Sequence, residues 1–120
     1  MKYLLSALLL LSSSLIVADA VKVSHDAFKK LQQDLPKLKV LDVRAESEYS
    51  EGHIEGAINA PHEDIEKILS SVNKEDTIVM YCRSGRRAGI VAEMLEEKGY
   101  KNLFHLDGDM RAGLRQENQL

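Results

Sequence analysis

The sequence predicts an α/β domain with a mainly parallel central sheet of about five short strands flanked by helices. Short apolar runs alternate along the chain with segments of helical periodicity. The run at 77–81 is apolar on both faces, as expected at the centre of a parallel sheet that helices cover on both sides. No repeat, low-complexity tract or internal linker divides the chain, so its 120 residues predict one domain.

The first twenty residues are expected to lie outside this domain. A positive start at Lys2 is followed by an uncharged apolar run at 4–17 and then by Ala18-Asp19-Ala20, the small-x-small pattern of signal peptidase sites. The run is short for a membrane span, which needs about 20 apolar residues. The sequence therefore predicts a cleavable secretory signal peptide over 1–20 and a mature domain over 21–120, with an uncleaved anchor as the alternative.

The mature chain is expected to begin with a strand at 21–23. Ser24 can cap a helix that carries Phe28 and Leu31 on one face and ends near Pro36.

Two further strands and two helices are expected before the central strand. The strands are predicted at 39–44 and 56–60. One helical turn is predicted at 46–50, and a longer helix over 65–72, where apolar residues fall at helical spacing.

After the central strand at 77–81 the sequence predicts a helix over 87–98. Lys98 suits its last turn and Gly99 a helix stop. A strand at 102–106 and a final helix at 109–116 follow. Binding sites in such sheets lie beyond the carboxyl ends of the strands, and Cys82 stands at that position in the chain.

Composition limits the function classes. The formal net charge is −3, which points to neither nucleic acid nor an anionic membrane surface as a partner. The single cysteine, Cys82, cannot form a disulfide within the chain, so it is a buried bystander, a crosslinking site or a reactive group. The four histidines show no HxxxH or HxH spacing, so no structural zinc site is expected.

The loop after the central strand is basic. Cys82 is followed by Arg83, Gly85, Arg86 and Arg87. A tight turn between a strand and a helix aims backbone N–H groups at one point, at the positive end of the helix dipole. This setting favours a thiolate and an anionic substrate. The alternative is a small buried cysteine beside solvated arginines.

Three stretches of the chain resemble the rhodaneses, the single-domain sulfurtransferases. LDVRAESEYSEGHIEGAINAP (41–61) resembles the first family signature, YCRSGRRA (81–88) the active-site loop, and KGYKNLFHLDGDM (98–110) the closing signature. With the export signal, the chain is most similar to the small periplasmic rhodaneses of the phage-shock kind. Two positions depart from the closing signature, because Asp109 stands where a second glycine is usual and Gly113 where a tryptophan is usual.

The resemblance implies a rhodanese-like fold and a mechanism. The Cys82 thiolate would take the outer sulfur of thiosulfate, carry it as a persulfide and pass it to cyanide or a thiol. No metal or organic cofactor is implied. The substrate-binding residues would be Arg83, Ser84, Gly85, Arg86 and Arg87. We expect Arg83 and Arg86 to face the substrate, whereas Arg87 can instead pair at the helix start.

Asp42 and Arg44 are expected to support the site rather than to act in the chemistry. Arg44 could pair with Glu46 or Glu48 in a frame beside the loop. His53 is expected to be a structural hydrogen-bonding residue, because a thiolate already formed needs no general base.

Other activities are alternatives, and most of them fit the residues of the loop less well. Cysteine phosphatases and arsenate reductases place an arginine six positions after the cysteine, and here that position is Ala88. A partner-dependent persulfide carrier would use Cys82 but turn over slowly. A binding module without chemistry usually lacks the cysteine, and a thiol–disulfide oxidoreductase would need a second one. We expect a periplasmic monomer without stable membrane insertion after cleavage.

Overall fold

The fold is built on a five-stranded sheet in the order β1-β5-β4-β2-β3, and every neighbouring pair is parallel. The structure is a computed structural model that describes residues 20–106. The strands are β1 (Val21–Val23), β2 (Lys39–Asp42), β3 (Ile58–Asn59), β4 (Ile78–Tyr81) and β5 (Leu103–Leu106). The predicted α/β architecture with about five parallel strands is confirmed.

Four helices within the described residues connect the strands. They are α2 (His25–Asp34), α3 (Glu46–Glu51), α4 (Ile65–Ser71) and α5 (Arg86–Glu97). The strand predicted at 39–44 ends earlier, at Asp42, because the Asp42 carboxylate accepts the Arg44 N–H at 3.0 Å and turns the chain. The strand predicted at 56–60 is confined to Ile58–Asn59.

Some predictions lie outside the described residues. These are the final helix at 109–116, the departures at Asp109 and Gly113, and most of the signal peptide. Cleavage after Ala20 stays a prediction, which N-terminal sequencing of the mature protein would test. Within residues 20–106, no helix has the length and apolar character needed to cross a membrane.

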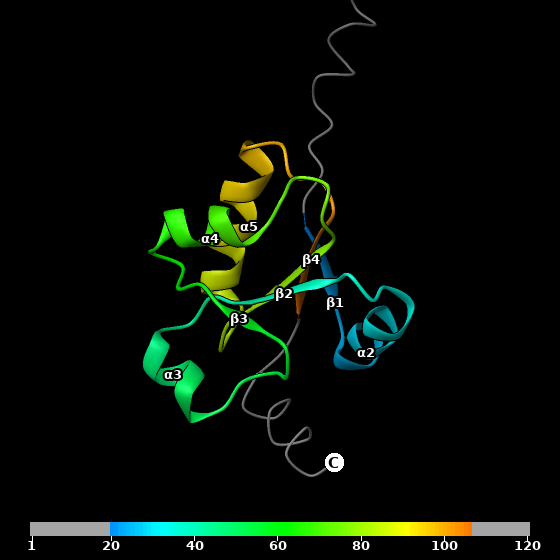
Figure 1. Cartoon of the computed structure of the whole chain (residues 1–120), viewed down its shortest axis with the longest axis horizontal. Coiled ribbons are helices and arrows are strands. Elements are labelled where there is room, and N and C mark those ends of the chain that lie inside the picture. The colour runs from blue at the N-terminus through cyan, green and yellow to red at the C-terminus, as the bar shows by residue number, and fades with distance from the viewer. Residues whose placement is uncertain (1–19, 107–120) are drawn as a thin grey trace, which may run out of the picture.

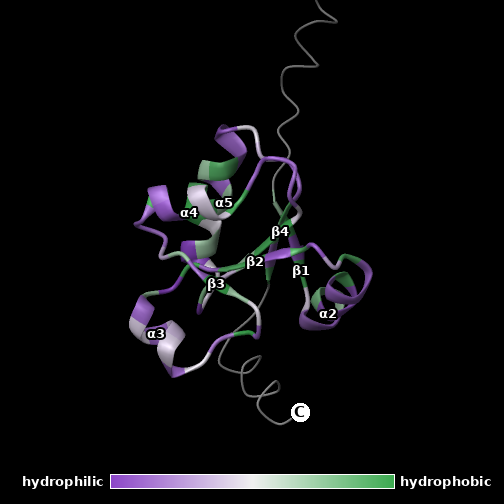
Figure 2. Ribbon diagram, viewed as in Figure 1, coloured by the Kyte–Doolittle hydropathy of each residue, from purple (hydrophilic) through white to green (hydrophobic). Residues whose placement is uncertain are grey.

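Helices cover both faces of the sheet. Ile78 and Met80 of β4 belong to the hydrophobic cluster under α4 and α5, whereas Val79 and Tyr81 belong to the cluster that includes Phe28 of α2. Figure 1 shows α4 and α5 together on one side of the sheet and α2 on the other. In Figure 2 β4 is largely green, as expected for a central strand buried on both faces.

The helix starts differ in how they are capped. The Ser24 hydroxyl accepts the Ala27 N–H at 3.2 Å, which confirms the predicted cap of α2, and Asp64 caps α4 in the same way. At α5 the N-cap is Gly85, which has a left-handed φ of 97° and no side chain to accept a hydrogen bond. The first-turn amides of α5 are therefore left for another acceptor.

Candidate active site

The sulfur of Cys82 is an acceptor for one of the first-turn amides of α5, that of Ala88. Cys82 directly follows β4, and its Sγ accepts the N–H of Gly85 at 3.0 Å and the N–H of Ala88 at 3.3 Å. Only 2% of the residue is exposed, and Cys82 packs into the hydrophobic cluster under α5, so the sulfur is largely shielded from water. Hydrogen bonds from N–H groups at a helix N-terminus stabilise a negative charge on sulfur. The arrangement can therefore hold a nucleophilic thiolate.

The three arginines of the loop have different surroundings. Arg83 and Arg86 are exposed and form no salt bridge within residues 20–106, and Ser84 is also exposed. Arg87 instead turns towards α3, where Nη1 lies 2.6 Å from Glu48 Oε1 and Nη2 lies 3.1 Å from Oε2. This geometry agrees with the alternative that Arg87 pairs at the helix start. It leaves Arg83 and Arg86 available to an anionic substrate.

The pair between Glu48 and Arg87 changes the titration of both groups. The hydrogen bond from Arg87 lowers the pKa of Glu48 to about 2, and the same hydrogen bond raises the pKa of Arg87. The bond joins the first turn of α5 to α3. Because α5 also carries the amides that hold Cys82, the pair anchors the helix start beside the sulfur.

The expected pairing of Arg44 with Glu46 or Glu48 is wrong. Arg44 pairs with Asp42, with 2.7 Å between Nη2 and Oδ2, and a second bond runs from Nε to Oδ1 at 3.0 Å. The turn after β2 brings these side chains together within the buried interior, whereas Glu48 faces α5. Burial by itself lowers the pKa of Arg44, but the hydrogen bonds and charge of Asp42 outweigh it and raise the pKa.

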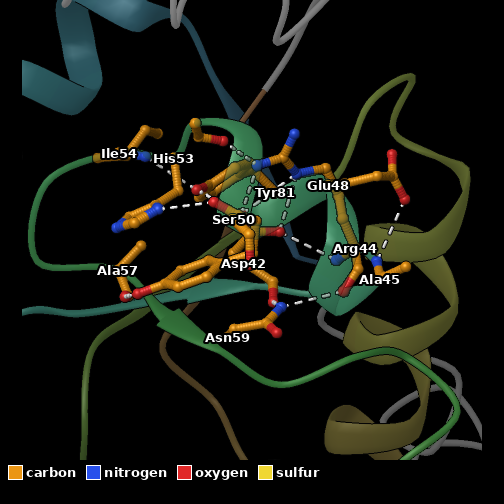
Figure 3. A network of polar contacts seen from close by, with 12 residues as sticks. Asp42, Arg44, Ala45, Glu48, Ser50, His53, Ile54, Ala57, Asn59 and Tyr81 are labelled. Atoms are coloured by element: carbon orange, nitrogen blue, oxygen red, sulfur yellow. Dashed lines mark hydrogen bonds and ion pairs between the residues drawn. The ribbon is translucent and has the colours of Figure 1, made fainter.

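Asp42 and Arg44 nevertheless form a frame, and Figure 3 shows it together with Tyr81. The Tyr81 hydroxyl donates to Asp42 Oδ2 at 2.8 Å and accepts the Ile54 N–H at 3.0 Å. Arg44 Nη2 also donates to the Gly52 carbonyl at 2.7 Å. The frame thus ties the segment after α3 to β2 and to β4, the strand that ends at Cys82.

Sequence reasoning missed Tyr81 as part of this frame. Its hydroxyl is fully buried, and burial raises the pKa of Tyr81 well above its ordinary value, so the group stays a neutral donor. A signal was present, because a buried tyrosine hydroxyl needs a polar partner. Nothing in the linear sequence identifies that partner as Asp42.

The histidines have structural contacts. His53 Nδ1 lies 2.8 Å from the Tyr49 carbonyl oxygen, and its ring stacks on that of Tyr49 at 3.6 Å, which agrees with a structural role. His105, which the sequence considered only for zinc spacing, lies beside the active-site loop, with Nε2 3.1 Å from the Gly85 carbonyl oxygen. The sequence held one signal for this position: alternation along a strand places residue 105 on the same face of the sheet as the apolar residue 103.

Comparison with known proteins identifies the family. The family model for the rhodanese-like domain matches residues 24–116. Thiosulfate sulfurtransferase PspE of Escherichia coli is 39% identical over 70 residues, which cover 57% of this chain and 67% of that protein. YrkF of Bacillus subtilis, described as a candidate sulfur carrier protein, is 33% identical over 90 residues, which cover 75% of this chain and 49% of that protein.

A solved structure supports the same conclusion. The human single-domain sulfurtransferase TSTD1 has a TM-score of 0.67 at 27% identity, covering 81% of this chain and 97% of that one. The matched region spans only about half of YrkF, so the activity of that whole protein does not transfer directly. Fold, loop and sequence agree, and the chain belongs to the rhodanese-like domain family, whose members include sulfurtransferases.

Proposed function

We propose that the protein is a thiosulfate sulfurtransferase that moves a sulfane sulfur through a persulfide on Cys82. The observation that carries the proposal is the position of Cys82 Sγ, which accepts two backbone N–H groups at the start of α5. The names of relatives, PspE among them, support the same chemistry.

The first half-reaction would load the sulfur. The Cys82 thiolate attacks the outer sulfur of thiosulfate, a new S–S bond forms, and the S–S bond of thiosulfate breaks. Sulfite leaves with the bonding electron pair. Arg83 and Arg86, exposed on the loop, would attract the thiosulfate dianion and stabilise the charge on the departing sulfite.

The second half-reaction would unload the sulfur. Cyanide or a thiolate attacks the outer sulfur of the persulfide, and Cys82 leaves as the thiolate. The negative charge thereby returns to Cys82 Sγ, where the N–H groups of Gly85 and Ala88 would again donate hydrogen bonds to it. The N–H groups of Arg86 and Arg87, in the first turn of α5, have no partner inside the helix and are suited to hold the transferred sulfur.

The test is intact-mass analysis of the protein after incubation with thiosulfate, followed by cyanide in the same tube. We expect wild type to gain one sulfur atom and to lose it to cyanide as thiocyanate appears. Cys82→Ser is the matched control, because its hydroxyl can still accept the two amides and cap α5. Absence of sulfur gain by wild type would reject thiosulfate as the donor.

A second candidate function is a persulfide carrier that needs a protein partner. The similarity to YrkF and the deep burial of Cys82 favour considering it. Steady-state turnover with thiosulfate and cyanide separates the two functions. A stable persulfide that forms but turns over only slowly would favour the carrier, whereas repeated turnover would favour the enzyme.

A further inference from the structure

His105 lies under the active-site loop. The residue sits on β5, is 9% exposed, and pairs across the sheet with Met80, two residues before Cys82. Paired residues of parallel strands point to the same face, so His105, Met80 and Cys82 share the face that α5 covers. The proposed chemistry gives this buried imidazole no part.

The ring contacts the loop at one residue. His105 Nε2 lies 3.1 Å from the Gly85 carbonyl oxygen, and a carbonyl only accepts, so Nε2 carries the hydrogen. Gly85 is the same residue whose N–H donates to Cys82 Sγ at 3.0 Å. A Cβ atom added at Gly85 would lie 3.4 Å from His105 Cε1, so the ring also packs directly against the glycine.

The backbone of Gly85 is one that a contact from another element can hold in place. Glycine has the freest backbone of all residues, and this one adopts a left-handed φ of 97°. Its carbonyl also accepts the Gly89 N–H at 2.9 Å, but that bond only ties Gly85 to α5. The bond from His105 ties Gly85 to β5.

Packing alone does not account for a histidine at this position. Within residues 20–106, His105 Nδ1 is buried without a hydrogen-bond partner. Such an atom costs stability, and an aliphatic side chain would fill the space without that cost. The feature that a histidine adds is the donor at Nε2.

We propose that His105 is a positioning residue, which holds the Gly85 peptide so that its N–H stays directed at Cys82 Sγ. The inference rests on the proposed function, in which Cys82 is the nucleophile. His105 would touch neither the sulfur donor nor the transferred sulfur. It would act through Gly85 by keeping the amide in place to stabilise the thiolate.

Three substitutions separate the effect of the hydrogen-bond donor at His105 from the effect of the packing of its side chain. In His105→Gln the amide nitrogen can occupy the place of Nε2, whereas in His105→Asn it falls nearer the place of Nδ1. His105→Met fills the space without a donor. The readout is the second-order rate of Cys82 alkylation by iodoacetamide at neutral pH, with thermal unfolding of each variant. Because Cys82 is the only cysteine, the alkylation reports on it alone.

We expect His105→Gln to react within about twofold of wild type. His105→Asn and His105→Met should react about five- to tenfold more slowly, the order expected for one ordinary hydrogen bond, because the bond that holds the Gly85 carbonyl is lost and the Gly85 N–H is held less firmly towards the sulfur. A His105→Met protein that is folded and alkylated at the wild-type rate or faster would overturn the proposal. Equal slowing of His105→Gln and His105→Met would also overturn it, because the donor retained in His105→Gln would have failed to restore the rate. If His105→Met does not fold, the comparison of His105→Gln with His105→Asn tests the same point.

This experiment is independent of the sulfur donor. Iodoacetamide requires only a reactive thiolate, so the alkylation rates test His105 even if thiosulfate does not load wild type. Persulfide formation in the same variants then links the two proposals. If thiosulfate loads wild type, the loading rate should follow the alkylation rate across the series.

Discussion

At the scale of single residues, the three loop arginines divide into two kinds. Arg87 is held by Glu48 in a two-bond contact, while Arg83 and Arg86 extend from the surface. A guanidinium that is already paired has less to offer a dianion than an unpaired one. The charge that attracts the substrate is therefore expected to come from Arg83 and Arg86, and Arg87 to shape the loop.

Removing the charge of either exposed arginine should lower the efficiency of the reaction with thiosulfate. We expect Arg83→Gln and Arg86→Gln each to lower kcat/KM for thiosulfate by about tenfold, the order expected for one hydrogen bond to a charged group. The thermal stability should stay close to that of wild type. Lys101→Gln, an exposed residue before β5, is the control and should leave kcat/KM unchanged. Unchanged kcat/KM in both arginine variants would mean that backbone amides alone bind the anion.

The pair of Glu48 and Arg87 should make stability depend on pH. Because the pKa of Glu48 is lowered from 4.5 to about 2, its contribution is complete above pH 4.5 and is lost as the pH falls towards 2. The Glu48 side chain is 28% exposed, so solvent screening limits the contribution to about 1 kcal/mol.

Denaturant unfolding of Glu48→Gln across a pH series checks this. We expect a loss of about 1 kcal/mol at pH 7 that shrinks as the pH falls through the same window. Glu93→Gln, an exposed carboxylate on α5, is the control and should cost little at any pH. A loss that stays constant down to pH 2 would show that the carboxylate charge is not its source.

At the scale of elements, the start of α5 is the feature that makes the site. Its N-cap, Gly85, lacks a side chain, and the Cys82 sulfur accepts the Ala88 N–H, which a serine or aspartate at the N-cap would normally accept. The sulfur also accepts the N–H of Gly85 itself. The nucleophile itself thereby caps part of the helix terminus. The arrangement depends on the left-handed backbone of Gly85.

Replacing two glycines of this region by alanine should change the stability of the protein in opposite directions. Gly85→Ala forces a side chain into a left-handed conformation, which costs about 1–2 kcal/mol, and should slow sulfur loading. Gly89→Ala lies inside α5, where the new Cβ would meet no atom within 4 Å beyond its chain neighbours and the helix's own backbone, and should stabilise the helix by up to about 1 kcal/mol. Thermal unfolding measures both. A stabilising Gly85→Ala substitution would contradict the described loop conformation.

At the scale of the whole molecule, the buried frame connects distant parts of the chain. Tyr81 and Asp42, 39 residues apart, meet between β4 and β2, and Tyr81 also holds the Ile54 amide after α3. Asn59 of β3 adds hydrogen bonds to the carbonyls of Asp42 and Arg44. The edge of the sheet that carries the family signature is thus joined to the strand that carries Cys82.

Removing one hydroxyl should weaken this connection. Tyr81→Phe leaves the Ile54 N–H buried without its acceptor and should lower the free energy of unfolding by about 1–3 kcal/mol. Tyr100→Phe is the matched control, because Tyr100 is also largely buried but its side chain makes no hydrogen bond within residues 20–106. Denaturant unfolding compares the two. An equal loss in both variants would point to ring packing rather than to the frame.

Within residues 20–106, local patterns in the sequence were sufficient for the order of strands and helices, the central strand, the cap at Ser24 and the place of Cys82 at a carboxyl end. Periodicity, glycine and capping residues act over a few neighbouring positions, so the linear sequence carries them directly. The motifs also predicted the family correctly. The helix over 87–98 was predicted one residue late at its start, since Gly85 caps the helix without a polar side chain.

Only the tertiary structure decided which polar groups meet. Arg44 pairs with Asp42 rather than with Glu46 or Glu48, Arg87 takes Glu48, and His105 reaches Gly85. Arg87 and Glu48 are 39 residues apart and His105 and Gly85 are 20 apart, and the strand order β1-β5-β4-β2-β3 brings these pairs together. Each residue had several candidate partners of suitable charge in the chain. The choice among these partners depends on side-chain direction and burial, which are set only when the strands and helices pack together.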